Sequence, residues 1–429
     1  MKKYFFKLLV LSLFFLYTYP KIKNKNEIKT LTMQEAVELG YKFRPSLRAL
    51  QFNTQANQYV EKQALSGYRP QISFSNYSFY ARGTKNLQNQ IALTGSQLIY
   101  SFANPIDQFK IAKKGTLISK LDEDTHKNQI RNQVENAFLL AYLEQEKLNS
   151  IDSLDNSAKK NIKEAKHKKK LNLLGKNDWL IEKAKYAKDE SFVKFYIDEK
   201  NIAQKELERL TGTTIFSSEN KAILEWNAPT KINLQDLNEY IAIALQNRPE
   251  IKALTTLIEK EHLDSRYYKN TYLPSIGING EISRTSTIGS TEGTIIRLNK
   301  ISSNIGLGIS WNFSDGGSNF YKSSQLHAKK LKAIMDKESM VKQIRLEVET
   351  AYYELSKAKK EEDAKFIEYK QAKNQFELRK QEFEIGNISE TTFTSTKTEW
   401  EQKQFEWLAI KINTTIRQNN LNFACSYSA

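Results

Sequence analysis

Apolar and polar side chains alternate along several stretches of the chain. The clearest alternation has small or polar residues between five apolar ones, namely Ile305, Leu307, Ile309, Trp311 and Phe313. A period of two places the apolar residues on one face of a β-strand and the others on the opposite face. The pattern predicts one pair of strands over 274–283 and 301–313, and a matching pair over 70–81 and 89–102.

The strand predicted over 89–102 changes its phase along its length. Leu93 belongs to one phase and Tyr100 to the other, and Gly95-Ser96 lies where the phase changes. A change of phase at a glycine predicts a β-bulge there. The connection over 82–88 is short and the one over 284–300 is longer, which is ordinary variation for surface loops.

Between the strands the pattern becomes helical. Residues 105–172 contain Gly115 as their only interior glycine and no interior proline, and 318–384 contain neither, so each predicts a helix of roughly 100 Å. An apolar seam at helical spacing consists of Ile344, Val348, Ala351, Tyr352 and Leu355. Shorter helices are predicted over 46–65, 250–272, 178–210 and 389–418. The last two reach only about 50 Å, so they match a long helix only if the short helices stack end to end on them.

The whole set of elements occurs twice. Arg44-Pro45 is followed by Pro70 and Arg248-Pro249 by Pro274, and both pairs are offset by 204 residues. Leu174-Gly175-Lys176-Asn177 likewise answers Ile385-Gly386-Asn387-Ile388 at an offset of 211. The duplication predicts one elongated, pseudo-symmetric body rather than two independent domains. Its expected parts are a first repeat over 30–212, a linking segment over 213–232, a second repeat over 233–418 and a tail over 419–429.

The N-terminus and the charge indicate a secreted chain. Met1-Lys2-Lys3 and the apolar run after it predict a signal peptide over 1–20, with no clear cleavage site. The net charge of +16 comes from lysines spread along helix surfaces, so we expect no nucleic-acid partner. The densest cluster, Lys166–Lys170, lies at a helix C-terminus, where cations complement the helix dipole. Partner binding at this tip is the alternative reading of the cluster.

Residues that could carry out chemistry are sparse. The four histidines are scattered without metal-ligand spacing, and no phosphate-binding loop, dinucleotide fingerprint or nucleophile elbow is present. Cys425 is the only cysteine and cannot pair within the chain. We therefore expect a protein that is not an enzyme, with no cofactor, no catalytic residue and no metal.

Four amphipathic strands in one chain leave two sheet edges unpaired. In lipid each backbone polar group needs a partner, so such strands must close a barrel with further copies of the chain. At this point the sequence resembles the TolC-like outer-membrane efflux proteins over about 31–418. The resemblance rests on the ordered duplication, the Arg-Pro pairs, Leu31–Val37 with its looser copy Asn233–Leu237, and the turn Phe383–Ser389.

The resemblance implies a mainly helical fold with membrane strands. Three chains would form a 12-stranded β-barrel in the outer membrane, continuous with a long α-helical tube across the periplasm. The implied function is a passive exit duct of a tripartite efflux or type I secretion system. Its implied partners are two further copies of the chain, outer-membrane lipid, a periplasmic adaptor (membrane fusion) protein and an inner-membrane transporter.

The resemblance also implies where partners dock and where the pore narrows. Docking on the adaptor is expected at the two helix tips, at Gly175, Lys176, Asn177, Asp178, Gly386, Asn387, Ile388 and Ser389. Glycine favours the left-handed end of a helix, and Asp178 and Ser389 are expected to cap the helices that follow. Well-known members carry acidic residues six and nine positions after the second glycine, in the pore constriction.

In this chain the residues at those two positions are not acidic. They are Thr392 and Ser395, and the matching residues of the first copy are Ile181 and Ala184. Rings of carboxylates favour cations, so we expect weak cation selectivity, unless neighbouring acidic residues take their place, namely Glu384, Glu390, Asp178 or Glu182. A secreted or periplasmic coiled-coil scaffold or adhesion protein is the alternative to a channel, but it would not need two symmetric hairpins.

Overall fold

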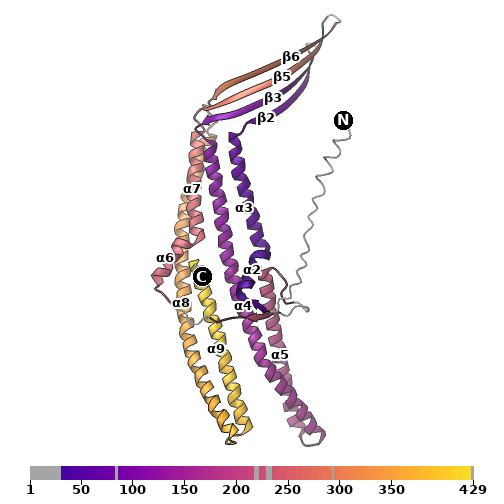
Figure 1. The fold of residues 1–429 in the computed structure, drawn as a ribbon, viewed down its shortest axis with the longest axis vertical. Helices are drawn as coiled ribbons and strands as arrows, with labels where there is room; N and C mark the ends of the chain where they lie inside the picture. Colours follow the sequence, from indigo (N-terminus) through magenta and orange to yellow (C-terminus); the bar gives the residue numbers. More distant parts are fainter. Residues whose placement is uncertain (1–29, 83–85, 217–221, 229–233, 292–293, 427–429) are drawn as a thin grey trace.

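The computed structural model describes residues 30–426 except 83–85, 217–221, 229–233 and 292–293. Residues 1–20, where a signal peptide is predicted, lie outside the described residues. Figure 1 shows an elongated molecule with the large sheet at one end and long helices running away from it; this sheet has four strands. Among the described residues, no helix is both long and apolar enough to cross a membrane.

Apart from one short 3₁₀ helix in the first repeat, the two repeats contain the same elements in the same order. The first comprises β1 (Thr30–Thr32), α2 (Met33–Phe43), α3 (Pro45–Ala64), the short 3₁₀ helix η1 (Leu65–Tyr68), β2 (Gln71–Ala81), β3 (Asn86–Ser101), α4 (Pro105–Lys170) and α5 (Lys176–Thr211). The second comprises β4 (Ile223–Glu225), α6 (Leu237–Asn247), α7 (Pro249–Asn270), β5 (Ser275–Thr291), β6 (Thr294–Ser310), α8 (Ser318–Glu384) and α9 (Glu390–Cys425). The duplication predicted from the sequence is present in the fold.

Local chemistry sets the helix starts at equivalent places in the two repeats. Thr32 caps α2 in a capping box with Glu35, and Asp236 caps α6 through the backbone N–H of Asn238. Pro45 and Pro249 occupy the first turns of α3 and α7, where a missing N–H costs little. The residue before each proline is extended, so each helix pair bends there.

The helix lengths agree with the predicted tube. α4 has 66 residues and α8 has 67, whereas α5 and α9 have 36 each. Figure 1 shows α3 above α5 and α7 above α9, so in each repeat two shorter helices together run beside one long helix. α9 continues to Cys425, so most of the tail expected over 419–429 is helix. The helix extends because Leu421, Ala424 and Cys425 are buried.

Each repeat has its own apolar core beside its long helix. In the first, Val134 and Phe138 of α4 pack in one cluster with Leu31, Leu47 and Leu207. In the second, the predicted seam of α8 packs with α9 and α6, and Ile344, Val348 and Leu355 are almost fully buried. Burial also raises the pKa of the Cys425 thiol to about 11, so it behaves as a small apolar residue.

The middle of the molecule joins the two repeats. β1 and β4 pair in parallel, so the first strand of the second repeat lies beside the first strand of the first repeat. Glu208, near the end of α5, accepts hydrogen bonds from the backbone N–H groups of Ile215 (2.9 Å) and Phe216 (2.7 Å). The linking segment predicted over 213–232 is therefore held against the helices at its first residues.

The large sheet has the strand order β2-β3-β5-β6, and every neighbouring pair is antiparallel. The prediction of a long loop over 284–300 was wrong. Residues 275–291 and 294–310 are paired along their whole length. Strand pairing uses backbone N–H and C=O groups, so it tolerates the Gly, Ser and Thr residues that indicated a loop. The bulge predicted at Gly95-Ser96 lies instead between Leu98 and Tyr100, and Gly95 is paired in register on both sides.

Gly212, at the end of α5, lies close to the backbone at the end of α2. Gly212 has a φ of 72°, and a Cβ there would lie 3.0 Å from the carbonyl carbon and oxygen of Phe43. We expect Gly212→Ala to destabilise the protein by about 3 kcal/mol, through left-handed strain and the clash together. Gly386 has a φ of 76° but open space around it, so Gly386→Ala should cost only about 1 kcal/mol.

The midpoints of urea unfolding of the two variants, followed by helical circular dichroism, measure this difference. Equal shifts of the two midpoints would show that the contact with Phe43 contributes nothing beyond the backbone conformation.

Candidate functional site: the two faces of the sheet and the two helix tips

The strand register sorts the sheet residues into two faces. Residues directly opposite each other in antiparallel strands point to the same face. Following the pairs from β2 to β6 assigns one face, here called the apolar face, to Ile72, Phe74, Leu93, Tyr100, Ile276, Ile278, Ile282, Ile305, Leu307 and Ile309. The other, here called the polar face, carries Ser73, Thr94, Asn279, Glu281, Ser283, Ser302, Asn304, Gly306 and Gly308.

The bulge in β3 completes the apolar face. With unbroken alternation, Tyr100 would lie on the opposite face from Leu93. The register shift after Leu98 places Tyr100 opposite Ile276 instead, so its ring joins the isoleucines. A bulge re-aims the side chains that follow it, and in β3 it corrects the change of phase seen in the sequence.

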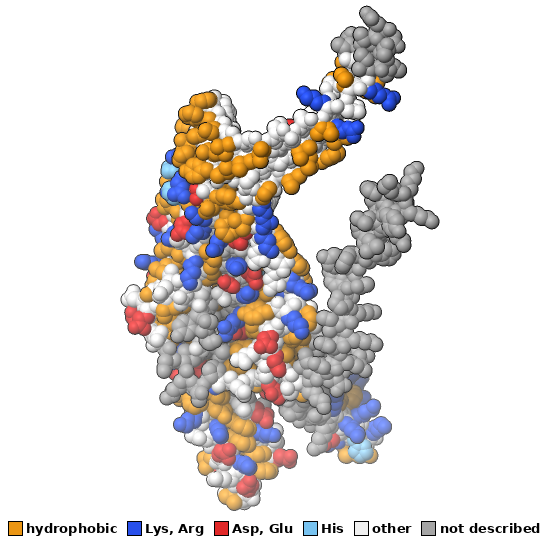
Figure 2. Space-filling model, turned by 45° about the horizontal axis from the view of Figure 1, so that its top comes forward, with side chains coloured by type: hydrophobic (Ala, Val, Ile, Leu, Met, Phe, Trp, Pro, Cys, Tyr) orange, Lys and Arg blue, Asp and Glu red, His pale blue; other side chains and the backbone are white. Residues whose placement is uncertain are grey.

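The apolar face lies open in the single chain. The exposed fraction is 83% for Ile305, 73% for Ile309 and 69% for Phe74, and Figure 2 shows apolar side chains over the sheet. Monomeric soluble proteins rarely expose so large a contiguous apolar area. The polar face is instead cross-linked by hydroxyl contacts, such as Ser283 to Ser302 at 2.9 Å.

The apolar face has the length of a membrane span. On β6 it runs from Ile301 to Ile309, interrupted by Ser303, and Arg284 of β5 lies opposite Ile301. These nine residues, 301–309, match the 9–11 that a tilted strand needs to cross a bilayer. The pattern weakens toward the hairpin ends, where Tyr77 and Phe79 of β2 lie on the polar face. Within the described residues, β2 and β6 each have one strand neighbour and are the sheet edges.

At the opposite end of the molecule, α4 and α8 stop in the same backbone motif. The N–H of Leu173 bonds to the carbonyl of Lys168 (2.9 Å), and the N–H of Asn387 bonds to that of Glu382 (2.8 Å). Together with a shorter-range bond in each turn, these are the two bonds of a Schellman motif. The left-handed residues are Asn172, with a φ of 55°, and Gly386, with a φ of 76°.

Two of the expectations for these turns were wrong and two were right. Gly175 has a φ of −63° and precedes α5 as its N-cap, because Asn172 takes the left-handed position that was assigned to the glycine. Asp178 lies inside the first turn of α5 and does not cap it. Gly386 is left-handed, and Ser389 caps α9 by accepting the N–H of Thr392 at 3.2 Å.

The turn geometry changes which residues of the two repeats are equivalent. Asn172 corresponds to Gly386 and Gly175 to Ser389, an offset of 214 rather than 211. Thr392 then corresponds to Asp178, Ser395 to Ile181, and Ala184 to Thr398. The first repeat therefore has a carboxylate, that of Asp178, at the position equivalent to Thr392. These four candidate constriction residues, Ile181, Ala184, Thr392 and Ser395, are all exposed in the single chain.

The eight residues expected to bind the adaptor fall into two separate groups. Gly175, Lys176, Asn177 and Asp178 lie between α4 and α5, and the other four lie between α8 and α9. Figure 1 shows the two tips apart from each other at the lower end of the molecule. All eight are exposed except Ile388, which is half-buried.

Stacked aromatic rings join α8 to α9 above their tip, a feature that we did not predict. Three pairs of rings lie nearly parallel, with interplanar angles of 9°, 7° and 9°: Phe383–Phe393, Phe376–Trp400 and Tyr369–Trp407. On each helix the rings recur every seven residues, which is the spacing of a coiled-coil seam. That heptad spacing was the signal in the sequence that could have revealed these three stacked pairs, here called the aromatic rungs.

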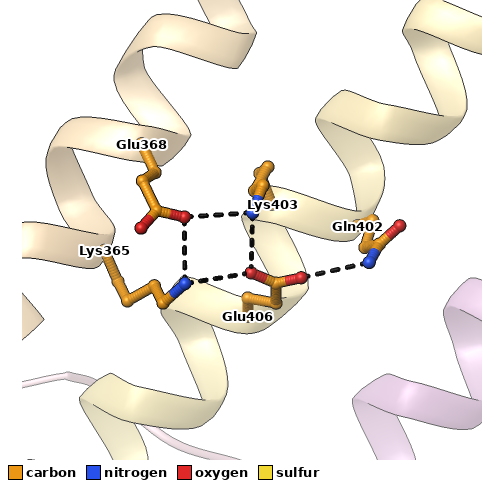
Figure 3. A network of polar contacts seen from close by, with 5 residues as sticks. All are labelled: Lys365, Glu368, Gln402, Lys403 and Glu406. Carbon is orange, nitrogen blue, oxygen red and sulfur yellow. Dashed lines mark hydrogen bonds and ion pairs between the residues drawn. The ribbon is translucent and has the colours of Figure 1, made fainter.

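A square of four charged side chains lies next to the Tyr369–Trp407 rung (Figure 3). Lys365 and Lys403 each contact both Glu368 and Glu406, at distances between 2.9 and 3.4 Å. Hydrogen bonds from Lys365 and then Lys403 lower the pKa of Glu368. Gln402 also donates to Glu406 at 3.1 Å. The network aligns α8 with α9, but its side chains are partly exposed, so we expect it to add little stability.

The described residues hold no group of three or more His, Cys, Asp or Glu side chains that could bind a metal ion. Of the four histidines, His126 is engaged by Ser46 at 2.8 Å and Gln129 at 3.3 Å. The surfaces that stand out in the described part of the chain are the open apolar sheet and the two exposed helix tips.

Comparison with known proteins identifies this architecture. Residues 240–425, most of the second repeat, match the model of a family described as outer membrane efflux protein. No curated protein matches the chain. The Campylobacter jejuni CmeC outer membrane channel has a similar solved structure, with a TM-score of 0.68 and 16% identity over 92% of this chain and 85% of that one.

Two further solved structures are similar over the same share of this chain, 92%. The outer membrane protein VceC of Vibrio cholerae has a TM-score of 0.65 and 12% identity, with 95% of its own chain covered. The Neisseria gonorrhoeae MtrE outer membrane channel, in its open state, has a TM-score of 0.65 and 13% identity, with 88% covered. At such identities the likeness establishes the fold, and it includes the first repeat, which lies outside the family match.

Proposed function

We propose, on the premise that this chain is a TolC-like outer-membrane efflux protein, that three copies form one continuous exit duct. Their twelve strands would close a barrel in the outer membrane, and their helices would form a tube across the periplasm. The protein is a channel rather than an enzyme, in keeping with the family that it matches. Substrates would be handed over by an inner-membrane pump through a periplasmic adaptor and would pass without chemical change.

The observation that carries this proposal is the open, two-faced sheet with free edges. Its apolar face is exposed over the length of a membrane span, and β2 and β6 each lack one neighbour within the described chain. In lipid the backbone groups of these edges need partners. Pairing β6 of one copy with β2 of the next supplies them, and it turns every apolar face toward lipid and every polar face toward a common lumen.

The helices support a tube of several copies in the same way. Exposed apolar side chains recur along α8 on faces that its own repeat does not cover, including Leu346, Tyr353 and Ile367, with exposed fractions of 64%, 63% and 68%. Leu346, Tyr353 and Ile367 are separated by multiples of seven residues, as expected of a further coiled-coil contact. Neighbouring copies would cover these residues.

The tips would then lie in a ring at the periplasmic end. Adaptor docking is proposed at Gly175–Asp178 and Gly386–Ser389, which are exposed turns on long helical arms. The pore constriction is proposed at Thr392 and Ser395 of the second repeat with Ile181 and Ala184 of the first. Asp178, which the turn geometry aligns with Thr392, is the nearest candidate for a charged ring.

Negative-stain imaging of the full-length protein, extracted from outer membranes in detergent, tests the duct. We expect three-fold particles with a helical tube of about 100 Å below a short membrane ring. Single-channel recordings on the same sample should show a conducting pore with weak cation selectivity. A soluble rod, or a monomer that binds no detergent, would contradict the proposal and favour a periplasmic scaffold.

A further inference from the structure

The two helix tips carry opposite charge. Matched segments, chosen with the offset of 214 that the turns establish, are residues 163–185 around the α4–α5 tip and 377–399 around the α8–α9 tip. The first contains eight lysines and three carboxylates, a net charge of +5. The second contains three basic residues and five carboxylates, a net charge of −2. Two turns of the same backbone geometry thus carry surfaces of opposite net charge.

Most of the lysines at the α4–α5 tip have no ion pair with a carboxylate of the described residues. Within the described part of residues 163–185, the ion pair found is that of Lys185 with Glu182, at 2.9 Å. At the α8–α9 tip, by contrast, Arg379 is neutralised by Glu382 at 2.6 Å on its own helix. Lys168, Lys170 and Lys176 are all exposed, and Figure 2 shows Lys and Arg side chains gathered at the lower end of the molecule.

Helix electrostatics accounts for only part of this cluster. Lys168, Lys169 and Lys170 lie in the last turn of α4, where cations interact favourably with the helix dipole. Lys176 lies in the first turn of α5, at the positive end of that helix, where a cation is unfavourable. A structural role for the lysines therefore explains those on α4 but not the one on α5.

The aromatic rungs differ between the tips in the same sense. The rung Phe383–Phe393 of the second repeat corresponds to Lys169 and Trp179 in the first. There the Lys169 ammonium lies 4.5 Å from the centre of the Trp179 ring. A cation–π contact holds a lysine in place without neutralising its charge. The first tip is thus built around a cation where the second is built around stacked rings.

We propose that the α4–α5 tip binds an acidic surface of a periplasmic protein partner, and that the α8–α9 tip does not share this role. The inference rests on the proposed function, in which both tips face the periplasm, and it assigns the charge of the partner surface. In a three-fold ring, three basic tips would alternate with three acidic ones. Complementary charge of this kind steers association and fixes the register of a partner.

Binding of a fluorescent 20-residue polyglutamate peptide to the detergent-purified full-length protein tests the proposal. In the test variant, Lys168, Lys170 and Lys176 are changed to Glu, and Lys169 is kept because it packs on Trp179. In the matched control, Arg379, Lys380 and Lys397 at the other tip are changed to Glu, so that net charge falls equally. We expect the test variant to weaken binding about tenfold or more, and the control less than about twofold.

A companion variant with Gln at the same three lysines keeps the test independent of folding. It should lose a smaller part of the affinity, because it removes charge without adding repulsion. Equal losses in the test and control variants would show a response to net charge alone and would overturn the proposal. So would the absence of binding at low salt, or tighter binding to phosphatidylglycerol vesicles than to the peptide, which would assign the tip to a membrane surface.

Light scattering of the same samples separates this inference from the proposed function. A monomeric wild-type protein would contradict the trimeric duct, yet the comparison between the two tips would still be measured. A trimer whose polyglutamate binding ignores the α4–α5 lysines would retain the duct and reject the acidic partner.

Discussion

Replacing Ile305 by arginine should prevent stable assembly in the outer membrane, whereas replacing the adjacent Asn304 by arginine should leave assembly intact. Ile305 lies on the apolar face, at the middle of the β6 segment from Ile301 to Ile309, and its exposed fraction is 83%. An arginine at the middle of the lipid-facing band of a barrel costs about 2–4 kcal/mol. In a trimer this cost would be incurred by each copy.

Asn304 is the matched control because the two positions differ only in the face to which they point. Asn304 is paired with Glu281 and lies on the polar face, toward the proposed lumen. A new arginine there would remain in water, so we expect a normal amount of trimer. The three added charges should lower cation conductance, since charged rings in a pore repel ions of their own sign.

The measurement is the fraction of outer-membrane protein that runs as trimer by size exclusion in detergent, with single-channel recording on the Asn304→Arg protein. Ile305→Arg should yield little or no trimer, while Asn304→Arg should match the wild type. If Asn304→Arg were the damaging change, the two faces would be assigned the wrong way round. If neither variant had an effect, the sheet would not lie in lipid.

Much of the fold could be predicted from the sequence because the chain repeats itself and its periodicities are long. The alternation around Ile305 identified a strand, and the spacing of Ile344, Val348 and Leu355 identified the seam that the structure buries. These patterns record which side of an element is covered. The end-to-end stacking of short helices also followed from length alone, since a helix rises by a fixed distance per residue.

The errors arose where backbone pairing or backbone conformation overrides side-chain pattern. Residues 284–300 are rich in Gly, Ser and Thr and predicted a loop, yet 284–291 and 294–300 are paired strand, because the partner strand supplies the hydrogen bonds. At the first tip, Asn172 takes the left-handed conformation that was given to Gly175. Asparagine is one of the few other residues that tolerate it, so matching glycine to glycine displaced the two repeats by three residues.

That displacement changed which first-repeat residues were assigned to the candidate pore constriction. With the offset of 211, the first-repeat residues matched to Thr392 and Ser395 were Ile181 and Ala184. With the offset of 214, they are Asp178 and Ile181. The contacts across α8 and α9, such as the charge square around Glu368 and Glu406, depend on which helix turns face each other. A sequence shows the residues of each helix but not that alignment.

The second large effect is expected at Arg248, where α6 meets α7. Its side chain is only 6% exposed, and it donates to Glu250 at 2.8 Å and to Glu347 of α8. Burial lowers the pKa of the guanidinium, but the hydrogen bonds to Glu250 and Glu347 outweigh it and leave the pKa raised. This ion group joins the kink before Pro249 to the long helix of the second repeat.

We expect Arg248→Met to destabilise the protein by about 3 kcal/mol, because it strips two partly buried carboxylates of their partner. That value lies at the low end of such costs, since Glu347 is 36% exposed. The duplication supplies the control. Arg44 is the equivalent residue, but it donates to neutral Gln133 at 2.9 Å, so Arg44→Met should cost about 1 kcal/mol.

A third variant, Glu347→Gln, gives the second repeat the same pair as the first and separates charge from packing. It should also cost about 1 kcal/mol, because a hydrogen bond to the guanidinium can remain. Urea midpoints of the helical signal, measured on the detergent-solubilised full-length proteins, rank the three. If Arg248→Met were no worse than Arg44→Met, the buried ion group would add nothing to a simple hydrogen bond. The order that we expect instead makes Arg248 the residue that fixes the bend between α6 and α7 against α8.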